Sequence, residues 1–325
     1  MSGDLWRARS ILVTGATGVI GSWLVKDLLD RGAHVVALVR DDDPQAELIR
    51  SGDTARVSVT NGRLEDLWTL ERAINEHEVD TVFHLGAQTL VGVAHRLPFS
   101  TWETNVRGTY NVLEACRLHA SLVQRVVVAS SDKAYGEAAE LPYTEDSALD
   151  GRHPYEASKV CTEILCRSYH HTYGTPIAIV RCANVYGGGD LNWSRIVPGT
   201  IRSFHRGERP VLRSDGSYIR DYLYVKDAVA SYLRLAERLD EPAVCGEAFN
   251  FSAETTRTVM EIVLEIRRLM RCEDIEPLVL STAVGELRDQ RLSATKAGAV
   301  LGWAPEYDLE RGLRETIDWY RAFLA

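Results

Sequence analysis

The fold is decided by the stretch Ser10-Ile-Leu-Val-Thr-Gly-Ala-Thr-Gly-Val-Ile-Gly21. A short apolar run precedes its three glycines, and an amphipathic pattern follows over Ile20–Arg31. Glycines at such a turn let the backbone bend sharply and approach a pyrophosphate, whose charge is stabilised by the N-terminus of the next helix. We therefore expect a dinucleotide-binding turn after the first strand. Its cofactor-binding residues are predicted to be Gly15, Thr17, Gly18, Val19, Ile20 and Gly21.

The next part of the chain alternates short β-branched runs with amphipathic stretches. The expected strands are Ser10–Thr14, His34–Val39, Val57–Thr60, Thr81–Leu85, Arg125–Ser130 and Pro176–Arg181. The expected helices between them are Ile20–Arg31, Leu67–Glu76, Phe99–His119 and Pro154–Tyr173. This alternation is typical of βαβ units, and right-handed crossovers then favour a doubly wound parallel sheet. The predicted fold class is α/β, with a Rossmann sheet followed by a smaller, mixed α/β C-terminal substrate domain.

The pattern becomes irregular after Arg181 and predicts a domain boundary there. We expect residues 1–182 to form the dinucleotide-binding domain, with 220–252 returning to it through the strand-like run Ala248–Phe251. Residues 183–219 and 253–325 are expected to bind the substrate. Two helical stretches are expected in this last part, Thr258–Arg271 and Leu309–Ala325.

Composition excludes several classes of protein. Of 325 residues, 45% are hydrophobic and 26% are charged, which is ordinary for a globular chain and not for a disordered, collagen-like or coiled-coil one. No apolar run approaches the ~18 residues of a membrane span. The net charge of −9 argues against nucleic acid as the main partner. Six scattered cysteines and a polar N-terminus predict a cytoplasmic location, and no His or Cys spacing predicts a metal site.

The end of the second expected strand bears on the cofactor. An acid at this place binds the adenosine ribose of NAD, whereas an arginine accepts the extra phosphate of NADP. The sequence offers Arg40 and then Asp41, followed by two further aspartates. Because the acids would repel a phosphate, NAD is the predicted cofactor, and NADP stays open.

Two groups of polar residues predict the chemistry. Ser131, Asp132 and Lys133 follow an apolar strand, and the carboxyl ends of parallel strands face the ligand crevice. Tyr155 and Lys159 are one helical turn apart on the next expected helix. A neighbouring ammonium and a positive nicotinamide ring favour the phenolate of Tyr155, which can then act as a base near neutral pH.

At this point the chain resembles the extended short-chain dehydrogenase/reductase family, the nucleotide-sugar epimerases and dehydratases. Within that family it is most similar to the CDP-glucose 4,6-dehydratases. The matching motifs are Thr14–Gly21, His84-Leu-Gly-Ala87, Asn105-Val-Arg-Gly-Thr109, Tyr155 with Lys159, Asn184-Val-Tyr-Gly187, Arg220-Asp-Tyr-Leu-Tyr-Val225 and Leu301-Gly-Trp303; the likeness to CDP-glucose enzymes lies in Gly21–Leu24, Gln88, Ser131-Asp-Lys133 and Gly187–Asp190.

The resemblance implies a 4,6-dehydratase. Epimerases of this family need a Ser or Thr and the Tyr–Lys pair, whereas dehydratases also need a base and an acid next to that Ser. Lys133 matches the position of the base that takes the C5 proton, and Asp132 that of the acid that protonates the leaving C6 hydroxyl. A lysine can be a base only when its neutral form is accessible, through burial or nearby positive charge.

The resemblance also implies where the ligands bind. The substrate is expected to be a nucleotide-diphosphate sugar, because arginine suits phosphate oxygens. The expected substrate-binding residues are Gln88, Asn184, Pro198, Arg213, Arg220 and Arg288, and further cofactor contacts are expected from Leu64, Leu85 and Ala87. The nucleotide base stays open, because Asp221-Tyr222 stands where the CDP-glucose enzymes have Pro-Trp.

Two alternative functions stay open beside the dehydratase, and the sequence also predicts an assembly state. A 4-epimerase would use the same Tyr155 and leave C6 untouched. A non-catalytic dinucleotide sensor is a second alternative, against which the complete Ser131, Tyr155 and Lys159 set argues. The apolar faces of Phe99–His119 and Pro154–Tyr173 are expected, by resemblance, to pair across a two-fold axis, which predicts a homodimer.

Overall fold

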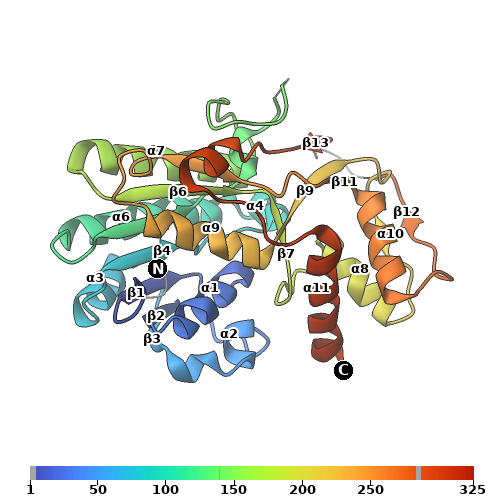
Figure 1. Ribbon diagram of the computed structural model, residues 1–325, viewed down its shortest axis with the longest axis horizontal. Coiled ribbons are helices and arrows are strands. Elements are labelled where there is room, and N and C mark those ends of the chain that lie inside the picture. Colours follow the sequence, from blue (N-terminus) through green and yellow to red (C-terminus); the bar gives the residue numbers. More distant parts are fainter. Residues whose placement is uncertain (1–4, 139, 283–286) are drawn as a thin grey trace.

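The computed structural model describes residues 5–138, 140–282 and 287–325. Its main element is a parallel sheet of seven strands in the order β10-β6-β5-β4-β1-β2-β3 (Figure 1). These strands are β1 (Ser10–Thr14), β2 (His34–Val39), β3 (Ser58–Asn61), β4 (Thr81–His84), β5 (Arg125–Ala129), β6 (Ile177–Cys182) and β10 (Ala248–Phe251). The predicted α/β doubly wound sheet is confirmed.

Side-chain alternation along the strands produces the two helical layers. Ile11 and Val13 of β1 belong to one buried cluster, whereas Leu12 between them belongs to another on the opposite face. The first cluster includes residues of α1 (Val19–Asp30) and α9 (Val225–Glu237), and the second includes residues of α3 (Leu67–Glu76), α6 (Gly108–Leu118) and α7 (Pro154–Tyr173). Both faces of the sheet are therefore covered, as an all-parallel sheet requires.

A smaller region lies at the right of Figure 1 and has a core of its own. Strand β9 pairs with three short strands, and a separate pair is formed by β8 and β12. The strands are β7 (Asn184–Tyr186), β8 (Val211–Leu212), β9 (Ile219–Tyr224), β11 (Thr256–Thr258), β12 (Leu278–Val279) and β13 (Asp289–Gln290); the helices are α8 (Ile196–His205), α10 (Val259–Met270) and α11 (Leu309–Leu324). The division into domains stays a prediction; α9 and β10 lie with the large sheet, and β9 with the small one.

The expected helix Phe99–His119 is interrupted in the structure. It consists of α5 (Pro98–Trp102), a π-helical segment (Glu103–Arg107) and α6. The π-helical segment contains the buried Asn105, whose side chain binds Gln88 and Ser158. Such an inserted turn reorients side chains and is frequent at functional sites.

Several helices of the structure were not predicted. The clearest is α9, although its apolar residues Val225, Val229 and Tyr232 recur at helical spacing. The other unpredicted helices are α2 (Glu47–Arg50), α4 (Val91–Arg96) and α8; short 3₁₀ segments span Asp53–Arg56 and Asp132–Tyr135, and a second π-helical segment spans Ala297–Leu301.

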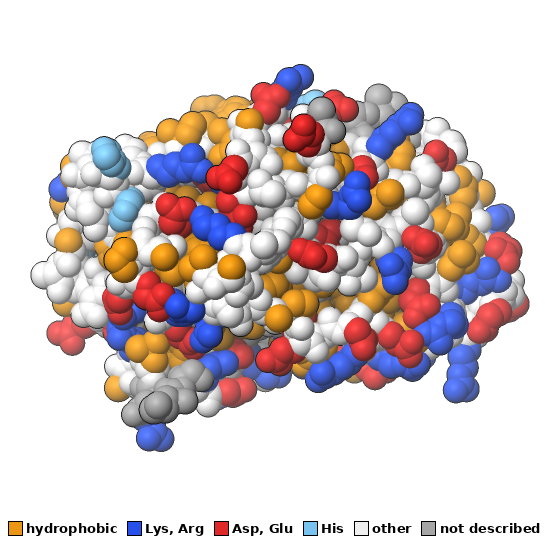
Figure 2. All heavy atoms as spheres, turned by 45° about the horizontal axis from the view of Figure 1, so that its top comes forward, with side chains coloured by type: hydrophobic (Ala, Val, Ile, Leu, Met, Phe, Trp, Pro, Cys, Tyr) orange, Lys and Arg blue, Asp and Glu red, His pale blue; other side chains and the backbone are white. Residues whose placement is uncertain are grey.

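The surface carries charges of both signs. On the face shown in Figure 2, Lys and Arg side chains are interspersed with Asp and Glu. Binding of an anion on this face therefore depends on a local group of arginines and not on a broad positive field. Within the described ranges, every helix is too short or too polar to cross a lipid bilayer.

Candidate active site

The glycine turn forms a close-fitting backbone loop between β1 and α1. Gly15 has a φ of +71°, and a Cβ there would lie 2.7 Å from the backbone nitrogen of Gly86. A Cβ on Gly21 would overlap the carbonyl oxygen of Gly15. Gly18 is the N-cap residue of α1 and no side chain caps this helix, so its first N–H groups point into the turn. Thr17, Val19 and Ile20 complete the segment, all three partly exposed.

The loop after β4 lies beside this turn. Gly86 of this loop approaches Gly15, and a Cβ on Gly86 would lie 2.9 Å from a methyl carbon of Leu64. Leu85 and Ala87 flank Gly86 and are partly exposed. Leu64, Leu85 and Ala87, the three predicted cofactor contacts, therefore lie next to the glycine turn.

Arg40 and Asp41 follow β2 and bind each other. The Arg40 Nε donates a hydrogen bond to the Asp41 carboxylate over 2.6 Å, and both side chains are exposed. The guanidinium is therefore already neutralised by an acid. A 2′-phosphate would have to compete with Asp41 for Arg40, which favours a cofactor without that phosphate.

The turn after β5 carries the predicted dehydratase residues. Ser131 donates a hydrogen bond from its Oγ to the Asp132 carboxylate over 3.0 Å and accepts one from the Lys133 backbone N–H. Asp132 is buried, and the Lys133 ammonium donates to the side-chain oxygen of Gln290 over 3.0 Å. One turn therefore carries all three side chains: Ser131 and Asp132 bind each other, and Lys133 extends to Gln290.

Tyr155 and Lys159 are both buried on α7. Burial raises the pKa of Tyr155, although a hydrogen bond with Ser131 and the charge of Arg195 oppose the rise. The protein's own groups thus keep Tyr155 in its phenol form, and the lowering expected from the sequence has to come from the positive nicotinamide ring. Burial lowers the pKa of Lys159 to about 8, and its ammonium donates to the Ala129 carbonyl over 2.7 Å.

His84 at the end of β4 is a neutral neighbour of this pair. Burial, helped by the charge of Lys159, lowers the pKa of His84 to about 3. Its two ring nitrogens lie 2.8 Å from the Thr14 hydroxyl and 3.1 Å from the Thr109 hydroxyl. His84 therefore ties β1 and α6 together and carries no charge at neutral pH.

The predicted diphosphate arginines lie on one small sheet. Arg220 is on β9, and Arg288 directly precedes β13, which pairs with β9. The Arg288 carbonyl accepts a hydrogen bond from the Ile219 N–H over 2.8 Å. Hydrogen bonds from Ser217 lower the pKa of Asp215, and the charge of Arg288 makes a smaller contribution. Residues 285 and 286 of the motif that contains Arg288 lie outside the described residues.

The other expected substrate residues come from four separate parts of the chain. The backbone of Gln88 makes two hydrogen bonds to the side chain of the buried Asn105. The Gln88 N–H donates to the Asn105 side-chain oxygen, and the Gln88 carbonyl accepts from the Asn105 side-chain nitrogen. Asn184 on β7 donates to the Asp221 carbonyl over 3.4 Å. Pro198 is buried in α8, and Arg213 donates to the Ser194 carbonyl from the end of β8. Arg213 thus follows a strand of the β8–β12 pair, whereas Arg220 lies on β9 of the other small sheet.

Two residues that the sequence analysis missed connect these groups. Gln290 is buried, receives the Lys133 ammonium and is paired in register with Arg220. Arg195 caps α8 and is the positive charge that acts on Tyr155. Neither residue belongs to a sequence motif that predicts catalysis. Their proximity to Lys133 and Tyr155 is visible only in the folded chain.

The loop that follows the turn is bound to the segment directly after β13. Tyr143 donates its N–H to the Arg291 carbonyl and accepts the Ser293 N–H at its own carbonyl, over 2.8 and 2.9 Å. Its hydroxyl donates to the Gly136 carbonyl over 2.6 Å. Hydrogen bonds of Tyr143 therefore connect the segment after Arg288 to the end of the turn after β5.

The site fits a dinucleotide and gives no sign of a metal. Gly15 and Gly21 have no room for a Cβ, and the uncapped start of α1 faces the turn, as an anion site requires. Among the described residues, no three His, Cys, Asp or Glu side chains are placed to hold a metal ion.

The comparisons with known proteins agree with this geometry. Residues 12–316 match the family of GDP-mannose 4,6-dehydratase. The CDP-glucose 4,6-dehydratase of Salmonella typhimurium is 30% identical, over 99% of this chain and 93% of the relative.

Two solved structures are also similar to this chain. The UDP-glucose 4-epimerase of Thermotoga maritima has a TM-score of 0.89 at 30% identity, over 97% of this chain and all of the other. The dTDP-glucose 4,6-dehydratase DesIV of Streptomyces venezuelae, solved with NAD, has a TM-score of 0.85 at 26% identity, over 96% and 97% of the two chains. The predicted family is thereby confirmed: this chain is an enzyme of the GDP-mannose 4,6-dehydratase family, within the nucleotide-sugar dehydratases and epimerases.

Proposed function

We propose that this enzyme is an NAD-dependent nucleotide-sugar 4,6-dehydratase. The observation that carries the proposal is the turn Ser131–Lys133, where a buried carboxyl and an amine adjoin the serine that hydrogen-bonds with Tyr155. An oxidation and return of hydride at C4 alone would need neither group. Their presence at the same turn supports elimination of water across C5 and C6.

Each residue then has a defined task. Ser131 binds the O4 oxygen and Tyr155 takes its proton, while Lys159 binds the cofactor ribose. When bound, NAD would supply the hydride acceptor for C4 and the hydride donor for C6, so that no net redox change would result. Lys133 as the free amine removes the C5 proton and returns it to C5 when the hydride reaches C6. Asp132 gives its proton to the leaving C6 hydroxyl, which departs as water.

The substrate class follows from the arginines on the small sheet. Arg220 and Arg288 are proposed to bind the diphosphate, because arginine forms paired hydrogen bonds to phosphate oxygens. Gln88, Asn184 and Pro198 are proposed to contact the sugar and nucleoside, with Arg213 as a further contact. The short distance between β9 and the Lys133–Gln290 pair supports a hexose bound next to Lys133.

The cofactor is proposed to be NAD and not NADP. The Asp41 carboxylate occupies the Arg40 guanidinium that would otherwise receive a 2′-phosphate. The related structure of DesIV was solved with NAD, which supports the same choice.

A second candidate is a nucleotide-sugar 4-epimerase. It is favoured by the fold similarity to the Thermotoga maritima epimerase, whose TM-score of 0.89 is above that of DesIV. Under this alternative Tyr155 and Lys159 keep their tasks, and Asp132 and Lys133 have no role in proton transfer.

We also propose a cytoplasmic homodimer. Exposed apolar side chains are present on α5 and α7, which pack against each other; examples are Phe99 and Ile164. Large apolar side chains exposed on two neighbouring helices support an interface there. Six free cysteines support a reducing compartment.

One experiment separates the candidate functions. The purified protein is incubated with NAD and, in turn, CDP-, GDP-, UDP- and dTDP-hexoses, and the products are weighed by mass spectrometry. Loss of one water supports the dehydratase. Unchanged mass with altered sugar stereochemistry supports the epimerase, and no turnover of any substrate contradicts both.

A further inference from the structure

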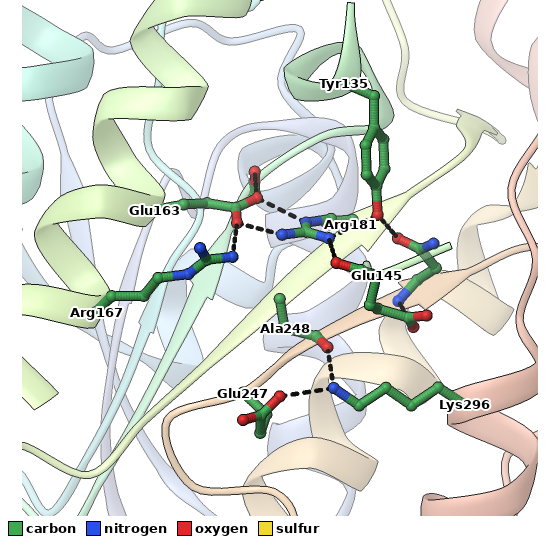
Figure 3. Close-up of polar contacts among 10 residues, drawn as sticks. Tyr135, Glu145, Glu163, Arg167, Arg181, Glu247, Ala248 and Lys296 are labelled. Carbon is green, nitrogen blue, oxygen red and sulfur yellow. Dashed lines mark hydrogen bonds and ion pairs between the residues drawn. The ribbon is translucent and has the colours of Figure 1, made fainter. Parts of the chain in front are cut away.

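Beneath the Ser131–Lys133 turn lies a buried ion pair that the proposed mechanism does not use. Glu163 on α7 and Arg181 on β6 are both fully buried. The Arg181 guanidinium donates to both oxygens of the Glu163 carboxylate, over 2.8 and 2.5 Å (Figure 3). The hydrogen bonds and charge of Glu163 outweigh burial and raise the pKa of Arg181, so the guanidinium stays charged.

The pair holds the residues on either side of the turn. On the N-terminal side, the Ser130 hydroxyl donates to the Glu163 carboxylate over 2.6 Å. On the C-terminal side, the Arg181 guanidinium donates to the Tyr135 hydroxyl over 2.6 Å. Ser131, Asp132 and Lys133 lie between these two points of attachment. One bidentate pair therefore fixes both ends of the segment that carries the proposed acid and base.

The attachment at Tyr135 is itself well supported. The Tyr135 hydroxyl donates to the side-chain oxygen of Asn250 on β10 over 2.8 Å. Its ring stacks on Tyr143 with centroids 4.7 Å apart. Figure 3 shows the hydroxyl of Tyr135 pointing toward the Arg181 guanidinium from the opposite side to Glu163. The position of Tyr135 is thus fixed from three directions.

A buried ion pair is a poor source of stability. Desolvation of the two charges offsets most of their attraction, and well-packed apolar residues of similar volume often serve equally well. What such residues cannot replace is the set of directed hydrogen bonds to Ser130 and Tyr135. We propose that Glu163 and Arg181 are positioning residues that hold Ser131, Asp132 and Lys133 in place for the reaction; this inference rests on the proposed dehydratase function.

The test replaces the pair as a unit. The double variant Glu163→Leu/Arg181→Met keeps the volume of the core and leaves no unpaired buried charge, so it is expected to fold. With the hexose that the wild type dehydrates, kcat should fall by about 10- to 100-fold with KM within about 3-fold, because a misplaced acid and base cost turnover and not binding. Hydrogen exchange of residues 130–136 should become faster, while that of β1 and α1 stays unchanged.

Coupling within the network provides a second readout. In the wild type, Ser130→Ala and Tyr135→Phe should each lower kcat by a few-fold, by releasing one end of the turn. In the double variant the same substitutions should cost little more, because the partner of each hydroxyl is already gone. Fully additive effects would mean that the pair does not act through Ser130 and Tyr135.

A matched control lies at the start of β5, the strand that leads into the turn. Arg125 begins β5, is buried, and donates to the Ala236 carbonyl and to Asp240. Arg125→Met should lower the melting temperature and leave kcat unchanged. An equal loss of kcat in both variants would show that general destabilisation, and not positioning, explains the result.

The outcomes separate the two proposals. A wild-type protein that dehydrates none of the sugars contradicts the proposed function, and hydrogen exchange of residues 130–136 then still tests whether the pair orders the turn. A wild type that dehydrates, with a double variant of normal kcat and unchanged exchange, overturns the inference alone.

Discussion

The Lys133 ammonium donates a hydrogen bond to the Gln290 side-chain oxygen, although the two residues are 157 positions apart in the chain. Gln290 is paired in register with Arg220. The proposed base is therefore attached to the small sheet that carries the proposed diphosphate site. If Arg220 binds the diphosphate and Lys133 is the base, as we propose, the two tasks are connected through the Gln290 amide.

Removal of that amide should impair elimination. In Gln290→Ala the Lys133 side chain loses its acceptor, and kcat for water loss is expected to fall about 10-fold with a small change in KM. Steady-state kinetics with the preferred nucleotide sugar measures both values. Gln45→Ala, a change on the exposed surface, is the control and should leave kcat unchanged. Unaltered turnover of Gln290→Ala would mean that Lys133 is positioned by other groups.

Lys133 and Tyr155 should be separable by stage of the reaction. Lys133→Ala removes the proposed base for the C5 proton, so water loss should stop while NADH still forms transiently. Tyr155→Phe removes the group that takes the O4 proton, so both NADH and water loss should be abolished. Stopped-flow absorbance of NADH, together with product mass, measures the two stages. Water loss at the normal rate in Lys133→Ala would exclude Lys133 as the base.

Lys159 should lower stability at neutral pH. Its pKa is about 8 in the folded protein against 10.5 for an ordinary lysine, so the unfolded chain binds more protons between these values. Stability should therefore rise as pH increases from about 8 to 10.5. Lys159→Met, which cannot be charged, should be more stable than the wild type at pH 7 by roughly 1–3 kcal/mol, and this gain should shrink by pH 10.

Urea unfolding at pH 7 and pH 10 measures this difference. The same variant should be inactive, because Lys159 is proposed to bind the cofactor ribose. A variant that is less stable than the wild type at pH 7 would show that the bond to the Ala129 carbonyl outweighs the cost of burying the charge.

The glycine turn should tolerate no side chain. Gly15→Ala adds a Cβ against the Gly86 backbone at a positive φ, so NAD affinity should fall at least about 10-fold and stability by roughly 1–3 kcal/mol. Gly52→Ala is the matched control, because Gly52 also has a positive φ but has open space around its Cβ position. Gly52→Ala should lower stability and leave the affinity for NAD unchanged. Titration of NAD by calorimetry compares the two, and normal NAD affinity in Gly15→Ala would remove the turn from the cofactor site.

The proposed dimer should depend on the α5–α7 surface. Phe99 is 76% exposed and Ile164 is 59% exposed. Charged residues at both places, in Phe99→Glu/Ile164→Glu, should convert a dimer into monomers, as measured by analytical ultracentrifugation. Trp68→Glu changes an equally exposed aromatic residue on α3 and should not alter the assembly. Dimers that persist in the double variant would place the interface elsewhere.

Local patterns in the sequence predicted the large sheet and the motif-bearing parts of the site. The expected bounds of β1, β2 and α7 agree with the structure, because each has a strong pattern and a sharp end, such as Pro154 and Gly174 around α7. The π-helical turn at Asn105 was missed, because it depends on tertiary partners that leave no local signal. Gln290 and Arg195 were missed for the same reason, since a contact with Lys133 or Tyr155 is a property of the folded chain.

The attachment of Tyr143 to Arg291 and Ser293 has a mechanical consequence. A displacement of the segment Arg291–Ser293 is transmitted to Tyr143 through these two hydrogen bonds. Through the Gly136 carbonyl that Tyr143 holds, the displacement reaches the base of the catalytic turn. The turn that carries Ser131, Asp132 and Lys133 is thus linked mechanically to the segment that follows Arg288.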